Sequence, residues 1–273
     1  MAKYGLPYQG SKSKLAERIV NMLPSANNFH DLFAGGCAIT HCALLSGKWE
    51  KVYANDITDS VKFFEDVALG KYHGRNEWIS REDFFKLKDS DAWVRLMYSF
   101  SNDQRTYLYS KDIEPYKKAV HEMITAENAQ GRRLAFRDVI RKAETLINNG
   151  KSRVAYDMEF LERVQALERI EGLERIEGLQ TSIGDYRDTK IGPDSVIYCD
   201  IPYKDTRNYH GMEFNHSAFY DWALSQTAPV FISEYTMPSD FECIAEFERT
   251  STFSATNNSL KKIERIYRPK TQL

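Results

Sequence analysis

Residues 195–203 read Ser-Val-Ile-Tyr-Cys-Asp-Ile-Pro-Tyr, a run of strand-forming residues that ends in an acid, a proline and an aromatic ring. The apolar run predicts a buried strand, and open α/β sheets bind their ligands at the carboxyl ends of such strands. The Asp200 carboxylate and the Ile201 carbonyl offer two acceptors beside the Tyr203 ring, which suits a flat, amine-bearing heterocycle such as adenine. A strand followed by a turn at Pro202 explains the same residues without any ligand.

A second informative pattern lies far upstream. The chain there predicts a strand at 29–33, a glycine loop at 34–36, a helix at 37–45 and a strand at 51–54. The second strand ends at Asp56, an acid suited to ribose hydroxyls, and glycines let a ligand approach the backbone closely. This order is that of the first half of a nucleotide-binding α/β unit. A triphosphate is not expected, because no GxxxxGK[ST] pattern occurs.

The middle of the chain has a different texture, with long polar stretches between about 61 and 180. We therefore predict an inserted, mainly helical domain at 61–180, between the two parts of an α/β domain at 1–60 and 181–273. Residues 131–153 carry seven positive side chains against two negative ones, a basic stripe that fits a phosphate track or a solvated helix face equally well.

Several shorter stretches also predict structure. Apolar spacing predicts a helix at 14–23, and strands are expected at 229–233 and in a hairpin of 252–258 with 263–267 that turns at Asn257-Asn258. The hexapeptide Leu-Glu-Arg-Ile-Glu-Gly occurs twice within 167–179, where we predict a helix interrupted at Gly172 and Gly178.

Composition limits the class of protein. The chain has 273 residues, 42% of them hydrophobic and 28% charged, and a formal net charge of −2, which is ordinary for a soluble globular protein. No run approaches the roughly 20 apolar residues of a membrane helix, and the N-terminus lacks a secretion signal. The four cysteines have no CxxC spacing, so we expect a reducing cytoplasm and no metal centre.

Four segments, in this order, resemble the alpha-group, Dam-like family of DNA adenine methyltransferases. Pro7-Tyr8-Gln9-Gly10-Ser11-Lys12 resembles the family's aromatic-x-G-[GS]-K motif, and Asp31-Leu32-Phe33-Ala34-Gly35-Gly36 resembles its acid-x-F-x-G-x-G loop. Asn55-Asp56 matches the acid after the second strand, and Asp200-Ile201-Pro202-Tyr203 matches the catalytic DPPY element. Gly184-Asp185-Tyr186 is a weaker echo of the family pattern.

The resemblance implies a Rossmann-like, S-adenosylmethionine-dependent methyltransferase sheet of seven mostly parallel strands, with the inserted domain recognising DNA. It implies S-adenosylmethionine as cofactor, yielding S-adenosylhomocysteine, with the contacts Tyr8, Gly10, Lys12, Asp31, Phe33, Gly35, Asp56, Asp185, Tyr186 and Asp200. The catalytic residues it implies are Asp200, Ile201, Pro202 and Tyr203. For duplex DNA we expect contacts from Asn102, Gln104, Arg105, Arg132, Arg133 and Arg137, side chains suited to phosphates or base edges.

Two positions depart from the family pattern. Ile201 stands where the family has a proline, and Cys37 stands where it has the last glycine of the loop. Because isoleucine also has the backbone carbonyl, we expect activity to survive. The alternatives are methylation of RNA or of a cytosine amine, and a catalytically degenerate DNA-binding protein. A restriction endonuclease partner is left open, and we expect a monomer or weak dimer in the cytoplasm of a bacterium or a phage-infected host.

Overall fold

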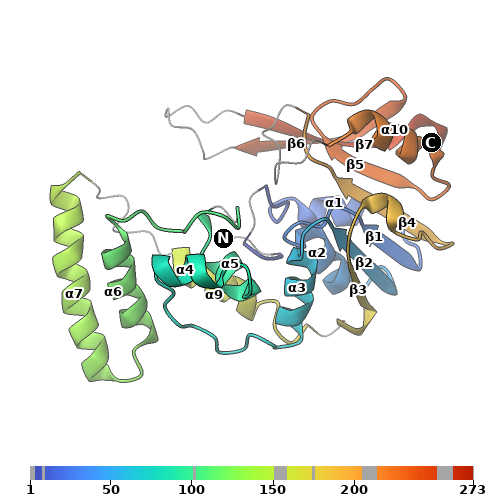
Figure 1. The fold of residues 1–273 in the computed structure, drawn as a ribbon. Coiled ribbons are helices and arrows are strands. Elements are labelled where there is room, and N and C mark those ends of the chain that lie inside the picture. Colours follow the sequence, from blue (N-terminus) through green and yellow to red (C-terminus); the bar gives the residue numbers. More distant parts are fainter. Residues whose placement is uncertain are drawn as a thin grey trace. The chain divides into compact units, whose positions relative to one another are not determined.

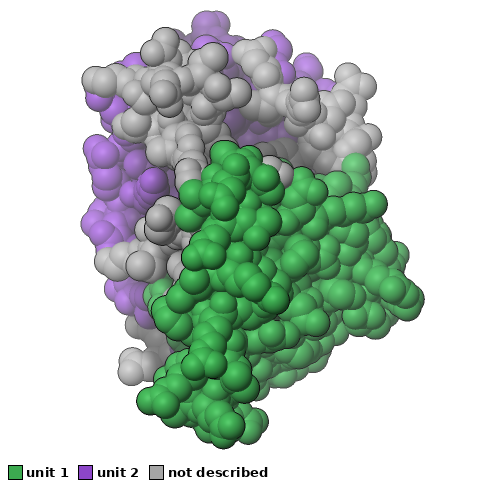
Figure 2. All heavy atoms as spheres, turned by 90° about the vertical axis from the view of Figure 1, so that its left-hand side faces the viewer, with its two compact units in different colours: residues 1, 7–9, 70–171 green, residues 2–6, 10–69, 172–273 purple. Residues whose placement is uncertain are grey.

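A computed structural model provides the fold. It describes residues 4–7, 10–100, 103–150, 159–173, 176–204, 214–250 and 261–272. Two compact units divide the chain, coloured purple and green in Figure 2. The sheet unit comprises residues 2–6, 10–69 and 172–273, and the helical unit comprises residues 1, 7–9 and 70–171.

The sheet unit is built on one seven-stranded sheet of order β3-β2-β1-β4-β5-β7-β6 (Figure 1). Its strands are β1 (Asn28–Asp31), β2 (Lys51–Asp56), β3 (Leu179–Ile183), β4 (Ser195–Asp200), β5 (Val230–Glu234), β6 (Phe241–Thr250) and β7 (Lys261–Pro269). The first five in this order pair in parallel, and β7 is antiparallel to both β5 and β6. The prediction of an open, mostly parallel sheet is therefore confirmed.

Helices of the sheet unit pack on the sheet and bury its apolar side chains. The sheet unit contains α1 (Ala16–Met22), α2 (Ala38–Ser46), α3 (Ser60–Ala68) and α10 (His216–Ser225), with short 3-10 turns η2 (Ile176–Gly178), η3 (Tyr186–Asp188) and η5 (Lys270–Gln272). Contacts join α2 to β1 and β2, and α3 to β2 and β3. Phe219 and Ala223 of α10 are fully buried in a cluster with Ile197 of β4 and Ile232 of β5, so the central strands are apolar along their length.

The helical unit contains α4 (Arg81–Leu87), α5 (Ala92–Met97), α6 (Glu114–Thr125), α7 (Ala129–Asn148) and α9 (Glu159–Glu168). Ser80, Asp91 and Asn128 cap α4, α5 and α7 by accepting backbone N–H bonds. Aromatic rings fill the core around α4 and α5, where Trp93 and Tyr98 are both fully buried. Figure 1 shows α6 and α7 side by side, packed through a small apolar cluster that includes Val120 and Leu146.

The bounds of the helical unit differ slightly from the predicted insertion at 61–180. Helix α3 packs on the sheet and β3 is one of its strands, so both belong to the sheet unit. The strand β3 is absent from the sequence prediction, because only Leu179 of its five residues is buried and no apolar alternation marks it.

One local prediction is corrected. Helix α9 ends at Glu168, so among the described residues of the predicted helix at 167–179 only the first two are α-helical, and Gly172 has φ +68°, which is incompatible with a continuing helix. Strand β6 pairs with β7, which contains the predicted strand at 263–267. The predicted hairpin strand at 252–258 lies outside the described residues and stays a prediction. The expected helix at 14–23 and the strands at 29–33, 51–54, 195–199 and 229–233 are confirmed within two residues at each end.

Candidate active site

Four acids stand at the last residues of four parallel strands that lie side by side. Asp56 ends β2, Asp31 ends β1, Asp200 ends β4 and Glu234 ends β5. The carboxyl ends of parallel strands meet at one edge, which is where open α/β sheets bind ligands. This edge of the sheet unit is therefore acidic and is the candidate active site.

The tetrapeptide of residues 200–203 lies at this edge, next to a residue from the N-terminal motif. Lys12 Nζ lies 2.7 Å from Asp200 Oδ1 and 2.5 Å from the Tyr203 hydroxyl. The same ammonium lies 3.3 Å from Glu264 Oε1, and the Tyr203 hydroxyl donates a hydrogen bond to that oxygen. Segments nearly 200 residues apart in the sequence thus share one cluster of hydrogen bonds.

Burial makes the charges in this cluster strongly dependent on one another. The side chains of Lys12 and Glu264 are 3% and 1% exposed, and that of Asp200 is 23% exposed. Burial opposes the charge of Lys12, but the two carboxylates outweigh it and raise the pKa of Lys12. Burial raises the pKa of Asp200 against the opposing effect of Lys12, and Glu264 raises it further.

Asp200 retains capacity for a ligand. Both polar contacts that the described residues make with its carboxylate end on Oδ1: the Lys12 ammonium donates to it at 2.7 Å, and the Tyr203 hydroxyl, whose hydrogen goes to Glu264, lies 3.3 Å away. Since each carboxylate oxygen can accept two hydrogen bonds, Oδ2 can accept one from an incoming amine.

The other residues of the tetrapeptide fix its backbone. Ile201 is buried in the apolar cluster that contains Phe219 and Ala223 of α10. His216 Nε2 donates to the Pro202 carbonyl at 2.8 Å. The Tyr203 ring packs against Tyr235, with ring centroids 4.5 Å apart.

Asp31 presents an unused acceptor at the same edge. Its Oδ2 accepts hydrogen bonds from the backbone and hydroxyl of Thr40, at 3.1 and 2.7 Å. Its Oδ1 is buried without a partner among the described residues. Burial raises the pKa of Asp31 to about 7, although Thr40 acts in the opposite direction. An orphaned buried acceptor of this kind fits a ligand that carries a hydrogen-bond donor.

The glycine loop is held in place by the next strand. Gly35, at φ +48°, donates its N–H to Asp56 Oδ2 at 2.8 Å and accepts a hydrogen bond from Ser60 Oγ at 2.7 Å. Asp56 Oδ1 accepts from the Thr58 backbone and hydroxyl. The predicted cofactor residues Gly35 and Asp56 are thus brought together, and a glycine at positive φ suits close approach of a ligand to the backbone.

The remaining predicted cofactor residues are more scattered. Gly184 N–H donates to the Asp56 carbonyl at 2.9 Å, which brings the segment of Asp185 and Tyr186 to the end of β2. Both Asp185 oxygens are engaged by Arg187, and the buried Tyr186 ring lies 5.1 Å from that of Phe33. Gly10 has φ +78° and is exposed, while Tyr8 lies outside the described residues.

The predicted DNA contacts are all in the helical unit. Gln104 and Arg105 belong to a turn in which Asp103 Oδ1 accepts hydrogen bonds from the backbone N–H groups of Arg105 and Thr106. Gln104 Nε2 is buried without a partner among the described residues. Arg132, Arg133 and Arg137 are exposed on α7. Asn102 lies outside the described residues, as do Lys151 and Arg153 of the basic stripe.

Three residues of the site are absent from the sequence prediction: Glu234, Glu264 and Gly5. Glu264 lies two residues before Ile266 on β7, so both side chains are on the same buried face of the strand. This two-residue spacing from an apolar residue was the sequence signal that could have predicted a buried acid. Gly5 has φ +72°, and an added Cβ would lie 2.5 Å from the Gly36 carbonyl oxygen. Leu6 N–H donates to that oxygen at 2.7 Å, so the N-terminal segment packs directly on the glycine loop.

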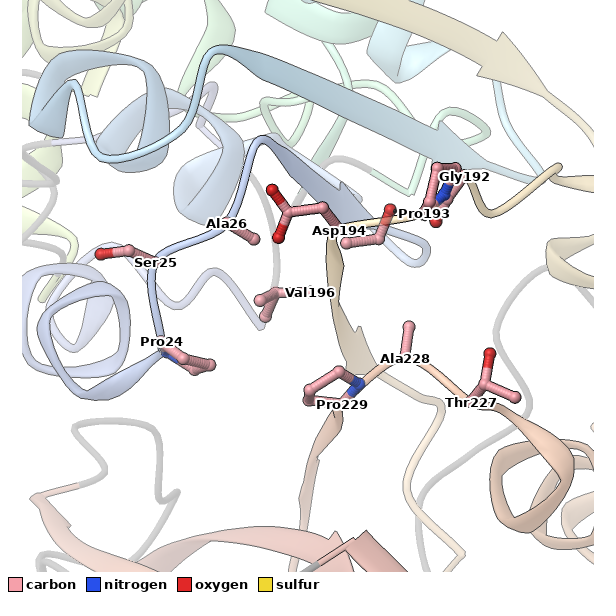
Figure 3. Close-up of a pocket in the computed structure, with 11 residues that line it drawn as sticks. Pro24, Ser25, Ala26, Gly192, Pro193, Asp194, Val196, Thr227, Ala228 and Pro229 are labelled. Atoms are coloured by element: carbon pink, nitrogen blue, oxygen red, sulfur yellow. Dashed lines mark hydrogen bonds between the residues drawn. The ribbon is translucent and has the colours of Figure 1, made fainter.

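A pocket of about 280 Å³ lies at the opposite edge of the sheet (Figure 3). Its lining comes from the loops that precede β1, β4 and β5, including Pro24, Asp194 and Pro229. Because these are the amino ends of the strands, this pocket is separate from the acidic edge. The described residues contain no group of three or more metal-ligating side chains and no helix long and apolar enough to cross a membrane.

Comparisons with known proteins complete the description. No curated protein matches the chain. A solved structure from Pyrococcus horikoshii, provisionally described as an RNA methyltransferase, aligns over 96% of this chain and 87% of that chain, with 10% identity and a TM-score of 0.39. A family model matches residues 8–268, nearly the whole chain. The chain belongs to the family of D12 class N6 adenine-specific DNA methyltransferases.

Proposed function

We propose that Asp200 and the Ile201 carbonyl bind the 6-amino group of adenine in duplex DNA during methyl transfer. Family membership supplies the reaction class, which is adenine-specific DNA methylation with S-adenosylmethionine as methyl donor. The observation that carries the residue assignment is the contact of Lys12, from the N-terminal motif, with Asp200 and Tyr203 at the end of β4.

The acidic edge fits the methyl donor. When bound, S-adenosylmethionine supplies an electrophilic methyl group on a sulfonium sulfur. We propose that Asp31 holds the donor through its orphaned Oδ1, while the Gly35 loop and Asp56 hold the nucleoside part. Roles for Tyr8, Gly10, Lys12, Phe33, Asp185, Tyr186 and Asp200 in binding it stay predictions.

The chemistry needs positioned acceptors more than a strong base. The adenine amine is a poor nucleophile because its lone pair is delocalised into the ring. Hydrogen bonds from its two N–H groups to Asp200 and to the Ile201 carbonyl favour a pyramidal nitrogen with its lone pair free. As the nitrogen–carbon bond forms and the methyl–sulfur bond breaks, the amine proton becomes acidic, and Asp200 is placed to accept it. The ring of Tyr203, tethered through its hydroxyl, would stack on the base.

The target base lies inside the duplex, so it must be flipped out at a cost of a few kcal/mol. We propose that the helical unit offsets this cost through phosphate contacts from Arg132, Arg133 and Arg137. Asn102, Gln104 and Arg105 would contribute to recognition of the target sequence. A restriction endonuclease partner, a monomeric or weakly dimeric state and a cytoplasmic location also stay predictions.

The test is the variant Asp200→Asn, which keeps the size of the side chain and removes its charge. Methyl transfer should fall by about 10²- to 10⁴-fold, because a charged acceptor of the amine proton is lost. Binding of the product S-adenosylhomocysteine, measured by calorimetry, should persist. Asp240→Asn, at an exposed position of the sheet unit, should leave the rate unchanged.

Mass spectrometry of the methylated nucleosides separates the alternatives. N6-methyladenine in DNA is the expected product. A methylated cytosine amine or methylated RNA would replace the proposed substrate, and DNA binding without any methylated product would indicate a catalytically degenerate protein. An Asp200→Asn variant with full turnover would refute the role of Asp200.

A further inference from the structure

The carboxylate of Glu264 is buried beside the proposed transfer site. Glu264 is 1% exposed on β7, and antiparallel pairing of Ser233 with Ile266 sets this strand next to β5. Burying a carboxylate costs several kcal/mol unless it is paired and hydrogen-bonded. Its partners here are the Lys12 ammonium, 3.3 Å away, and the Tyr203 hydroxyl, which donates to it.

Glu264 changes what Lys12 can do to Asp200. The ammonium has three hydrogens, and its neighbours are Asp200 Oδ1, the Tyr203 oxygen and Glu264 Oε1. With two carboxylates to satisfy, Lys12 is anchored even while Asp200 binds a substrate amine. Without the charge of Glu264, Asp200 would be the only carboxylate partner of Lys12 in this cluster, and the ion pair would compete with the amine.

The charge balance of the cluster points the same way. One ammonium and two carboxylates leave one negative charge in excess when Asp200 is ionised. The amine gains positive charge as its bond to the methyl group forms, so a buried negative charge nearby favours that step. Other acidic groups that interact with Asp200 are Asp31 and Glu234, and the Tyr198 hydroxyl also lies within its field.

We propose that Glu264 is a positioning residue for methyl transfer, which holds Lys12 and the Tyr203 hydroxyl so that Asp200 is free to accept the adenine amine. The inference rests on the proposed role of Asp200. It adds a second carboxylate to the site, on the antiparallel hairpin rather than on a parallel strand.

The experiment compares Glu264→Gln with the wild type in single-turnover methylation, steady-state kinetics and thermal unfolding. Glutamine still accepts the Tyr203 hydrogen bond, so the melting temperature should change little. We expect kcat to fall by about ten- to a hundredfold, the range of one charged hydrogen bond, with the KM for DNA nearly unchanged. The acidic limb of the pH–kcat profile should move to lower pH, because removing this negative charge lowers the pKa of Asp200.

Glu264→Asp keeps the charge and should recover much of the lost kcat and return the acidic limb toward that of the wild type. This second variant tests the proposal even if Glu264→Gln is less stable than the wild type. Equal kcat values and equal acidic limbs for Glu264→Gln and Glu264→Asp would overturn the proposal. The control is Glu246→Gln on β6, which loses a surface ion pair with Arg265 and should alter neither kcat nor the pH limb. Full activity of Asp200→Asn would overturn the proposed function itself. If Asp200→Asn is inactive but Glu264→Gln has the kcat and the pH limb of the wild type, this inference alone is overturned.

Discussion

Two buried acids at strand ends, Asp31 and Glu234, have raised pKa values. Glu234 is 1% exposed, has one oxygen without a partner among the described residues, and has its pKa raised by burial to about 7. Asp31 shares these features at the end of β1. The roles of Asp31 and Asp200 could be proposed from sequence motifs, whereas Glu234 and Glu264 match no motif. The phase of Glu264 with Ile266 could mark it as inward-facing, but its place beside Lys12 depends on how β5 and β7 pair.

The raised pKa of Glu234 predicts a pH-dependent gain in stability for Glu234→Gln. A carboxyl whose folded pKa lies above its unfolded pKa stabilises the fold least when it is ionised. The penalty grows between about pH 4.5 and 7 and then stays constant, at about 3 kcal/mol or less. Glutamine should therefore raise the melting temperature at pH 8 and change it little at pH 5. An equal change in melting temperature at pH 5 and pH 8 would contradict the raised pKa of Glu234. Glu242→Gln, at an exposed position, should change the melting temperature at neither pH.

At the scale of elements, the glycine loop and the N-terminal segment form one structure. The sequence predicted the strand, loop and helix at 29–45 because each is encoded by adjacent residues. It did not predict that Gly5 touches the loop, since contact between two turns leaves no periodic pattern. Cys37, at the family's glycine position, adopts φ +59° and ψ +32°, so the backbone keeps the left-handed conformation that glycine would take.

The close approach of Gly5 predicts a severe effect of Gly5→Ala. Its φ of +72° strains any other residue by about 1 kcal/mol, and the added Cβ would lie 2.7 Å from the Ala38 backbone. The glycine loop must then move, so we expect binding of S-adenosylhomocysteine to weaken by tenfold or more in calorimetry. Gly74→Ala is the matched control, because Gly74 has φ +70° in open space. Comparable losses of affinity in both variants would show that backbone strain alone is responsible.

At the scale of the whole molecule, the chain alternates between two folding patterns. The strands of the sheet unit come from both sides of residues 70–171. The change to long polar stretches in the sequence predicted this insertion. The family resemblance implied seven mostly parallel strands, but the order of those strands could not be derived from local patterns. The sequence did not predict β3, because its mostly exposed residues have the polar composition of a loop.

The exposed arginines of α7 predict how DNA binding depends on salt. No ion pair within the described residues engages Arg133 or Arg137, whereas Arg141 and Lys142 of the same helix both pair with Asp138. Replacing Arg133 and Arg137 with glutamine should weaken DNA binding and reduce the slope of log K against log salt by roughly 1 to 2. The control replaces Lys86 and Lys118, which pair with carboxylates on their own helices. An equal reduction in slope there would show a general effect of net charge.

The most direct measurement of the central claim is a crystal structure of the protein with target duplex DNA and an unreactive analogue of S-adenosylmethionine. The account predicts an extrahelical adenine whose amine donates hydrogen bonds to Asp200 and to the Ile201 carbonyl, with the analogue against Asp31 and the Gly35 loop. An adenine amine bound away from the end of β4, with Asp200 still closed onto Lys12, would contradict it.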